Sequence, residues 1–204
     1  MTRKILIALC SLALGSAAYA ATPEAAPVNT LDSGLLATMK AGSSGAGFSA
    51  RAANLAPVVE QSYDLPTVTQ NSVGFLWSTL PAAQQKQLID LIGQFTVASY
   101  ASQFTSFGGE SFTVSSTEKP LGQGFIVQST LTPGGGGDPV ELDYAVHNTP
   151  QGWRITDVLL GGTISQVALH ESDFASLVSS GDASRLITAL QSKIAALQSS
   201  SASN

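Results

Sequence analysis

Cysteine, histidine and charged residues are scarce in this chain of 204 residues. It has one Cys and two His, and 11% of its residues are charged, whereas about a quarter is usual for a soluble domain. Nine basic residues against fourteen acidic ones give a net charge of -5. This charge would repel a nucleic acid backbone or an anionic membrane surface, so we exclude nucleic-acid binding. The 44% of hydrophobic residues excludes a wholly disordered chain.

Long hydrophobic runs are also lacking, and the short run at the N-terminus has the organisation of an export signal. Arg3 and Lys4 precede an apolar stretch from residue 5 to residue 14, and small residues stand at Ala18 and Ala20. This order predicts a secretory signal peptide over residues 1–20. The stretch is shorter than the ~20 residues that a membrane-spanning helix needs.

Cleavage after Ala20 would leave a mature chain without cysteine, because Cys10 lies inside the signal peptide. Disulfides, thiol catalysis and thiolate metal sites are then excluded. Loss of Arg3 and Lys4 would leave seven basic residues against fourteen acidic ones, a net charge of -7. The fold must therefore be held together by its core alone.

The mature chain divides into one domain with two loose ends. We expect a flexible leader over residues 21–30, a single domain over 31–198 and a disordered tail over 199–204. Within the domain, Leu88, Leu91, Ile92 and Phe95 have helical spacing and predict a long helix from about 81 to 104. Further helices are expected at 31–39, 50–62, 65–77, 167–179 and 183–197.

Between the helical segments the apolar period changes from 3.6 to 2, which predicts four strands in succession. The alternating residues are Phe112 and Val114, then Phe125, Val127 and Leu131, then Val140, Leu142, Tyr144 and Val146, then Trp153, Ile155 and Leu159. The connections are turn-like, so an antiparallel meander is the simplest topology. The predicted fold is α+β, with a four-stranded antiparallel sheet covered on one face by helices and an apolar pocket between them.

Motifs for catalysis and for cofactor binding are absent. The tetraglycine at 134–137 lacks the Lys and Ser or Thr of a phosphate loop, and is predicted to be a hairpin loop. His147 and His170 lack the spacing of a metal pair, so we expect no metal, no cofactor and no catalytic residue. Asp157 has the same strand parity as Ile155 and would be buried, either as a structural hydrogen-bond acceptor or as a base.

Large apolar residues are concentrated on the helix and strand faces that would point at one another. A solid core explains them, and so does a cavity for an apolar ligand between sheet and helices. If a cavity exists, we expect it to be lined by Trp77, Phe95, Tyr100, Phe104, Phe125, Leu142, Tyr144 and Ile155.

Two stretches of the chain resemble a known family. The first is LAPVVEQSYDLPTVTQNSVGFLWSTLPAAQQKQLIDLIGQFTVASYASQF at 55–104. The second spans 141–190, where YAVHNTPQGWRITDVLLGGTIS carries Tyr144, Trp153, Asp157 and Gly162. The chain is similar to the MlaC-like, toluene-tolerance family of periplasmic lipid-binding proteins, and most similar to its hopanoid-biosynthesis-associated HpnM branch. One departure is the turn at 161–165, which reads GGTIS where the family often has Glu-Gly-Val-Ser.

The resemblance implies a monomeric periplasmic carrier that is not an enzyme. It would hold a phospholipid or a hopanoid in an apolar pocket and exchange it with an inner-membrane ABC transporter and an outer-membrane complex. One alternative is an enzyme for an isoprenoid-like substrate in the same pocket, with Asp157 as base and Tyr144 as oxyanion donor. Another is a secreted adaptor with a solid core.

Overall fold

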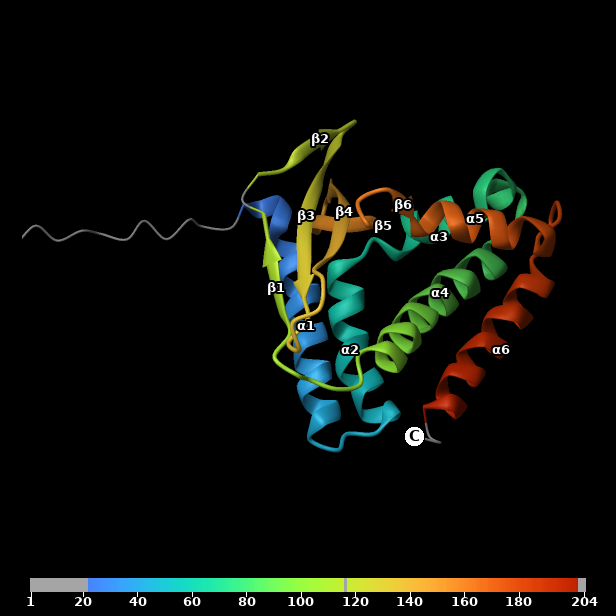
Figure 1. Cartoon of the computed structure of the whole chain (residues 1–204). Coiled ribbons are helices and arrows are strands. Elements are labelled where there is room, and N and C mark those ends of the chain that lie inside the picture. Colours follow the sequence, from blue (N-terminus) through green and yellow to red (C-terminus); the bar gives the residue numbers. More distant parts are fainter. Residues whose placement is uncertain (1–21, 116, 202–204) are drawn as a thin grey trace, which may run out of the picture.

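Helices come before and after a block of strands in the structure, a computed structural model that describes residues 22–115 and 117–201 (Figure 1). The predicted signal peptide lies outside these described residues. The α-helices are α1 (Ala26–Ser43), α2 (Phe48–Ser62), α3 (Leu65–Val73), α4 (Ala82–Gln103), α5 (Gln166–Phe174) and α6 (Ser184–Ser200). Three short 3₁₀ helices accompany them: η1 (Pro23–Ala25), η2 (Gly74–Thr79) and η3 (Ala175–Leu177).

The strands form one antiparallel sheet in the order β1-β3-β4-β5-β6, with β2 paired to β3. They are β1 (Ser111–Val114), β2 (Lys119–Leu121), β3 (Gly124–Thr132), β4 (Val140–Thr149), β5 (Gly152–Leu160) and β6 (Ile164–Ser165). The four predicted strands correspond to β1, β3, β4 and β5, but the count of four is wrong. Three exposed residues in β2 and two residues in β6 are too few to show a period of 2.

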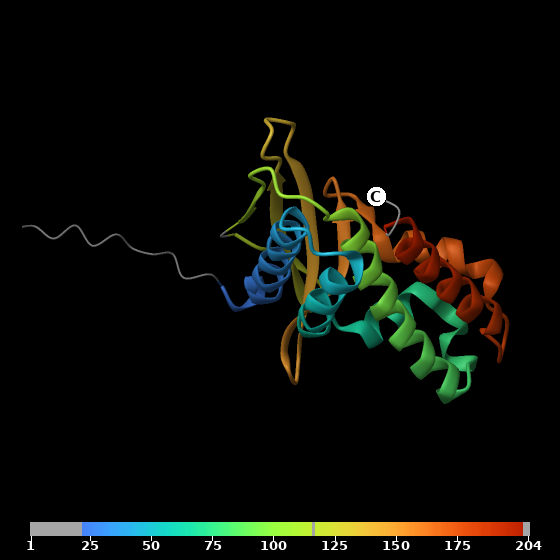
Figure 2. The same cartoon turned by 90° about the horizontal axis from the view of Figure 1, so that it is seen from below.

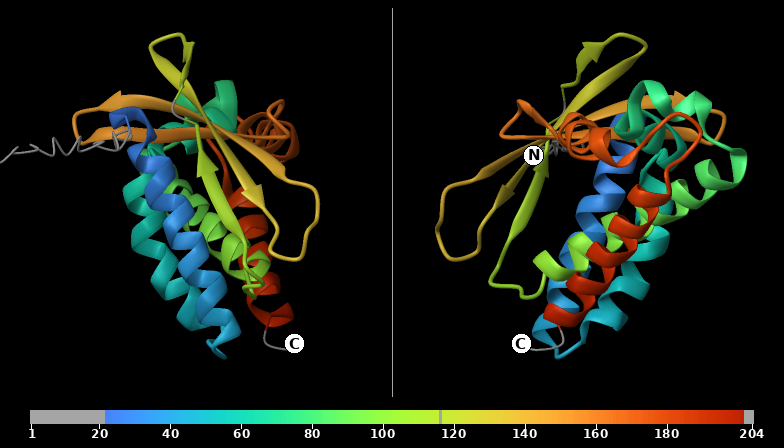
Figure 3. Two further views of the ribbon diagram at one scale, coloured as in Figure 1. Left: turned by 60° about the vertical axis from the view of Figure 1, so that its left-hand side comes forward. Right: turned by 90° about the vertical axis from the view of Figure 1, so that its right-hand side faces the viewer.

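The helices lie on one side of the sheet (Figures 1 and 2). Helix α1 packs against α2, α4 packs against α2 and α6, and α3 packs against α5. The sheet is strongly twisted, so that β1 runs beside α1 whereas β5 crosses the ends of the helices (Figure 3). This twist turns different parts of one sheet face toward different helices.

Both predicted loose ends are partly helical. The leader is wrong from residue 23 onward, because η1 and the first turn of α1 occupy it. Pro27 stands in the first turn of α1, where the missing N–H costs nothing, and Val28 is fully buried. At the other end, α6 continues to Ser200, so 199 and 200 are not part of a disordered tail. Residues 202–204 of that tail lie outside the described residues.

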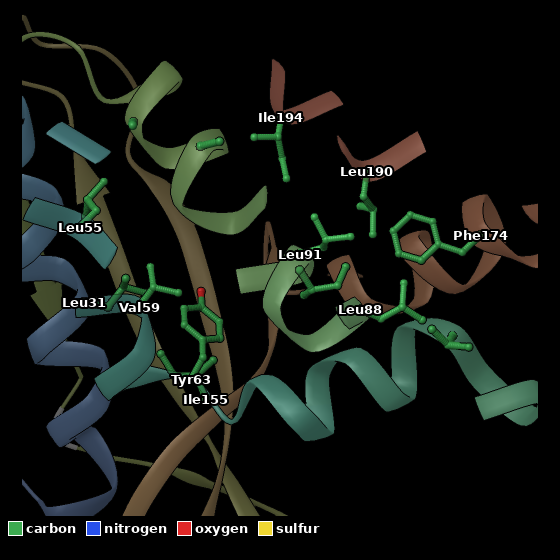
Figure 4. Packing of buried hydrophobic residues seen from close by; sticks show 14 of the residues in the cluster. Leu31, Leu55, Val59, Tyr63, Leu88, Leu91, Ile155, Phe174, Leu190 and Ile194 are labelled. Atoms are coloured by element: carbon green, nitrogen blue, oxygen red, sulfur yellow. The ribbon is translucent and has the colours of Figure 1, made fainter. Parts of the chain in front are cut away.

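Buried apolar side chains from every layer make one hydrophobic core. Figure 4 shows Leu31, Val59 and Ile155 where α1 and α2 meet the sheet, and Leu88 and Leu190 where α4 meets α6. Each of these five residues is 1% exposed or less. Among the helices of the described residues, none has the length and the apolar character required to cross a bilayer.

Candidate functional site

A cleft of about 350 Å³ lies between α4 and the sheet. This volume is at the lower end of the ~300–1,000 Å³ typical of ligand pockets. The lining residues come from α1, the end of α2, α3, α4, β4, β5 and α5. They are Leu35, Tyr63, Val68, Ser72, Ile92, Phe95, Thr96, Ser99, Tyr100, Gln103, Phe104, Leu142, Tyr144, Asp157, Val158, Leu160, Gln166, Val167 and His170.

Helix α4 forms one wall of the cleft with one of its two buried sides, and its other buried side packs against helices. Phe95, Ser99 and Tyr100 recur at helical spacing and line the cleft. Gly93 and Ala98 lie on the side that packs against α2 and α6, and both are buried. The second half of the helix is therefore buried on two sides, whereas Lys86, Gln87 and Asp90 in its first half are exposed.

The opposite wall is formed by β4 and β5, and a β-bulge decides which residues face the cleft. Tyr144 pairs with Val158, and Leu142 pairs with Leu160. Residues that pair directly lie on the same face of a sheet, so Val158 and Leu160 join Tyr144 in the cleft wall. The register shifts between Ala145 and Val146, which leaves one extra residue in β5 and changes the strand parity after Ile155.

A polar network lies where the two walls meet. The Tyr63 and Tyr100 hydroxyls are 2.6 Å apart and hydrogen-bonded, which joins the end of α2 to α4. Tyr144 donates a hydrogen bond of 3.5 Å to Asp32 of α1, and Ser129 of β3 donates one of 2.8 Å to the same carboxyl group. The three tyrosines line the cleft, whereas Asp32 lies behind its wall.

Burial governs the protonation of this network. It raises the pKa of Asp32 to about 7, although the hydrogen bonds from Ser129 and Tyr144 oppose this rise. It raises the pKa of Tyr100 to about 12 and the pKa of Tyr63 and of Tyr144 well above the ordinary value of a phenol. All three phenols therefore keep their protons at neutral pH and act as hydrogen-bond donors.

Uncharged polar side chains also line the cleft from α3 and α5. Ser72 is fully buried, and its hydroxyl has no hydrogen-bond partner among the described residues. The ring of His170 lies 5.9 Å from the ring of Phe95 and 5.3 Å from that of Phe174. Burial lowers the pKa of His170, so the imidazole is neutral at pH 7.

Asp157 ties the start of α5 to β5. Its carboxylate accepts hydrogen bonds from the Ser165 hydroxyl (2.5 Å) and from the backbone N–H of Val167 (3.1 Å) and of Val158 (2.7 Å). An enzyme with Asp157 as base and Tyr144 as oxyanion donor would need the two side chains to converge. Tyr144 instead donates to Asp32, so no specific geometry favours that alternative.

The Asp157→Ala change is expected to lower the free energy of unfolding by about 1–3 kcal/mol, because three donors lose their acceptor. They are the Ser165 hydroxyl and the Val167 N–H at the start of α5, and the Val158 N–H in β5. Asp157→Asn keeps one oxygen for the two backbone N–H groups and should recover most of this loss. Urea unfolding of both variants measures the difference. Equal losses for Ala and Asn would contradict the role of Asp157 as an acceptor.

Five of the eight residues predicted to line a cavity are brought together in the cleft: Phe95, Tyr100, Phe104, Leu142 and Tyr144.

The other three lie elsewhere. Trp77 belongs to η2, where its carbonyl accepts from Gln85. Phe125 packs edge-on against Trp153, with ring centroids 5.6 Å apart. Ile155 is fully buried in the solid core beside Tyr63.

Several lining residues escaped the sequence prediction. Leu35 was predicted to lie in a short helix, without a role in a cavity. Ser72 and His170 are polar, whereas the predicted lining was drawn from large apolar and aromatic residues. Tyr63 carried a usable signal, because the chain has four tyrosines and three of them, Tyr63, Tyr100 and Tyr144, converge on the cleft. Tyrosine combines a large apolar ring with a hydroxyl that needs a partner when buried.

Charge is almost absent from the cleft. No Lys or Arg is among its lining residues, and its one carboxylate, Asp157, is occupied by hydrogen bonds. Within residues 22–115 and 117–201, no three His, Cys, Asp or Glu side chains lie close enough together to hold a metal ion. The lining can therefore bind apolar and neutral polar groups, whereas Lys193, whose Nζ lies 5.9 Å from the centroid of the Phe95 ring, is not part of it.

The fold and the cleft define the class: an α+β protein with a ligand-sized cleft between a twisted sheet and its helices. The chain belongs to the MlaC protein family, whose model matches residues 29–192. Its fold is similar to that of a phospholipid-binding protein from Ralstonia solanacearum, solved in complex with a phospholipid. The TM-score is 0.71 at 23% sequence identity, covering 85% of this chain and 98% of that one. No curated protein sequence matches the chain.

Proposed function

We propose that this protein is a soluble lipid carrier of the periplasm, exported by its signal peptide over 1–20. It binds a phospholipid or a hopanoid in the cleft as a monomer, without a cofactor and without catalysing a reaction. It exchanges the lipid with an inner-membrane ABC transporter and an outer-membrane complex. Membership of the MlaC family and the fold shared with a phospholipid-binding protein support this proposal.

The observation that carries the proposal is the cleft itself, with its apolar side chains, protonated tyrosines and lack of cations. Each methylene that leaves water for such a site contributes about 0.8 kcal/mol, so a chain of roughly sixteen carbons contributes about 12 kcal/mol. Association and ordering costs offset a large part of this. A carrier needs only a site of this kind, because catalytic groups add nothing to the transport of a lipid through water.

A co-purified lipid is the expected result when the full-length protein is exported, purified without detergent and examined by native mass spectrometry. Extraction and mass spectrometry of the released lipid then distinguish a phospholipid from a hopanoid, and so test the assignment to the HpnM branch. A protein that emerges empty, and takes up no lipid from vesicles, would overturn the proposed function.

A further inference from the structure

Two of the uncharged hydroxyl protons in the cleft have no acceptor among the described residues. In the Tyr63–Tyr100 pair, only one of the two hydroxyls can donate to the other, so the acceptor keeps a proton of its own. No other hydrogen bond of either hydroxyl is present among the described residues. The hydroxyl of Ser72, fully buried in the same cleft, has no partner there either.

Unpartnered buried hydroxyls are costly, since each loses its hydrogen bonds to water without a replacement. Nearby hydroxyls show the usual solution for a helix, in which the side chain donates to a carbonyl one turn earlier. Thr69 of α3 donates to Leu65, and Thr96 of α4 donates to Ile92. Ser72 lies less than one turn from Thr69 on α3 but makes no such bond, so its proton is left without an acceptor among the described residues.

We propose that these donors recognise the ester carbonyl groups of an acyl-ester lipid, an inference that rests on the proposed carrier function and names its ligand class. Ester carbonyl oxygens accept hydrogen bonds and donate none, which matches a set of donors. The Tyr63–Tyr100 pair and Ser72 come from different elements around one cleft, so they can bond two carbonyls. The acyl chains lie along the apolar walls, and the phosphate stays outside because no cation lines the cleft.

The test compares two phosphatidylcholines with sixteen-carbon chains, one dihexadecanoyl with ester linkages and one di-O-hexadecyl with ether linkages. The ether lipid has the same headgroup and chain length but lacks the carbonyl acceptors. Uptake of each lipid from vesicles into the full mature protein is measured by native mass spectrometry. We expect the wild type to take up at least fivefold more ester lipid than ether lipid.

Two variants remove the free protons. The tyrosine pair needs the double change Tyr63→Phe with Tyr100→Phe, because either single change would leave the other hydroxyl with a free proton of its own. This double variant and Ser72→Ala should each reduce the preference for the ester lipid over the ether lipid several-fold. Thr69→Val is the matched control, because Thr69 is a buried hydroxyl of α3 that already donates to a carbonyl and does not line the cleft. Its preference should equal that of the wild type.

The outcomes separate this inference from the proposed function. Equal uptake of both lipids by the wild type overturns ester recognition and leaves the carrier function standing. A preference that survives both in the Tyr63→Phe, Tyr100→Phe double variant and in Ser72→Ala also overturns it. Uptake of neither lipid, with an empty protein after gentle purification, overturns the carrier function as well.

Discussion

The free energy of unfolding of the Asp32→Asn variant, relative to that of the wild type, is expected to rise by about 2–3 kcal/mol between pH 4.5 and pH 8. Asp32 is 4% exposed, and burial raises its pKa from 3.8 to about 7. For a carboxyl group whose pKa is raised by folding, stability is fully present below the unfolded pKa and is lost as the pH rises through the folded pKa. The wild type should thus lose the contribution of Asp32 between about pH 4 and pH 7.

Asn removes this dependence because it has nearly the shape of Asp and does not titrate. Its carbonyl oxygen can still accept from Ser129 and Tyr144, which donate to Asp32 in the wild type. Urea unfolding between pH 4.5 and pH 8 gives the two stability curves. Asp90→Asn is the control, because Asp90 is exposed in an ion pair with Lys86. The stability curve of this variant should run parallel to that of the wild type. A stability curve of Asp32→Asn that runs parallel to that of the wild type would contradict the raised pKa of Asp32.

The residues on the inner face of the sheet were predictable from the sequence as far as the β-bulge, but not beyond it. Alternation placed Leu142 and Tyr144 on the inner face, and they line the cleft. The same alternation carried through β5 placed Asp157 with Ile155. One extra residue in β5 pairs Asp157 with Ala145 and Val158 with Tyr144. A bulge is set by the pairing of two strands, so the sequence of one strand does not reveal it.

It was harder to predict which inward-facing residues line the cleft and which pack in the solid core. Phe95 and Phe125 are both half-buried aromatic residues on inward faces, yet Phe95 lines the cleft while Phe125 packs against Trp153. The difference depends on which helix lies opposite each residue, and thus on the twist of the sheet. Asp32 lay next to a segment read as a loose leader, because Ala and Pro were taken as signs of a flexible chain. Pro27 instead lies at a helix start, and its helix buries Asp32.

Filling the cleft should separate lipid binding from folding. Ser99→Trp places an indole on the side of α4 that lines the cleft, and helical side chains of this size lean back over the preceding turn, toward Phe95. We expect uptake of lipid from phosphatidylcholine vesicles to fall more than tenfold. The cost in stability should stay within about 1–3 kcal/mol, because the indole enters existing space before it displaces packed side chains.

Gln87→Trp provides the matched control for this experiment. Gln87 is exposed on the same helix, three turns before Ser99, and does not line the cleft between α4 and the sheet. It adds the same indole to the surface, so it reports any effect of a new aromatic residue on the contact between protein and vesicle. Native mass spectrometry gives the lipid occupancy of both variants, and urea unfolding gives their stability. If Ser99→Trp folds and still takes up lipid as well as Gln87→Trp does, the ligand lies outside the cleft between α4 and the sheet, since an indole and an acyl chain cannot share the same space.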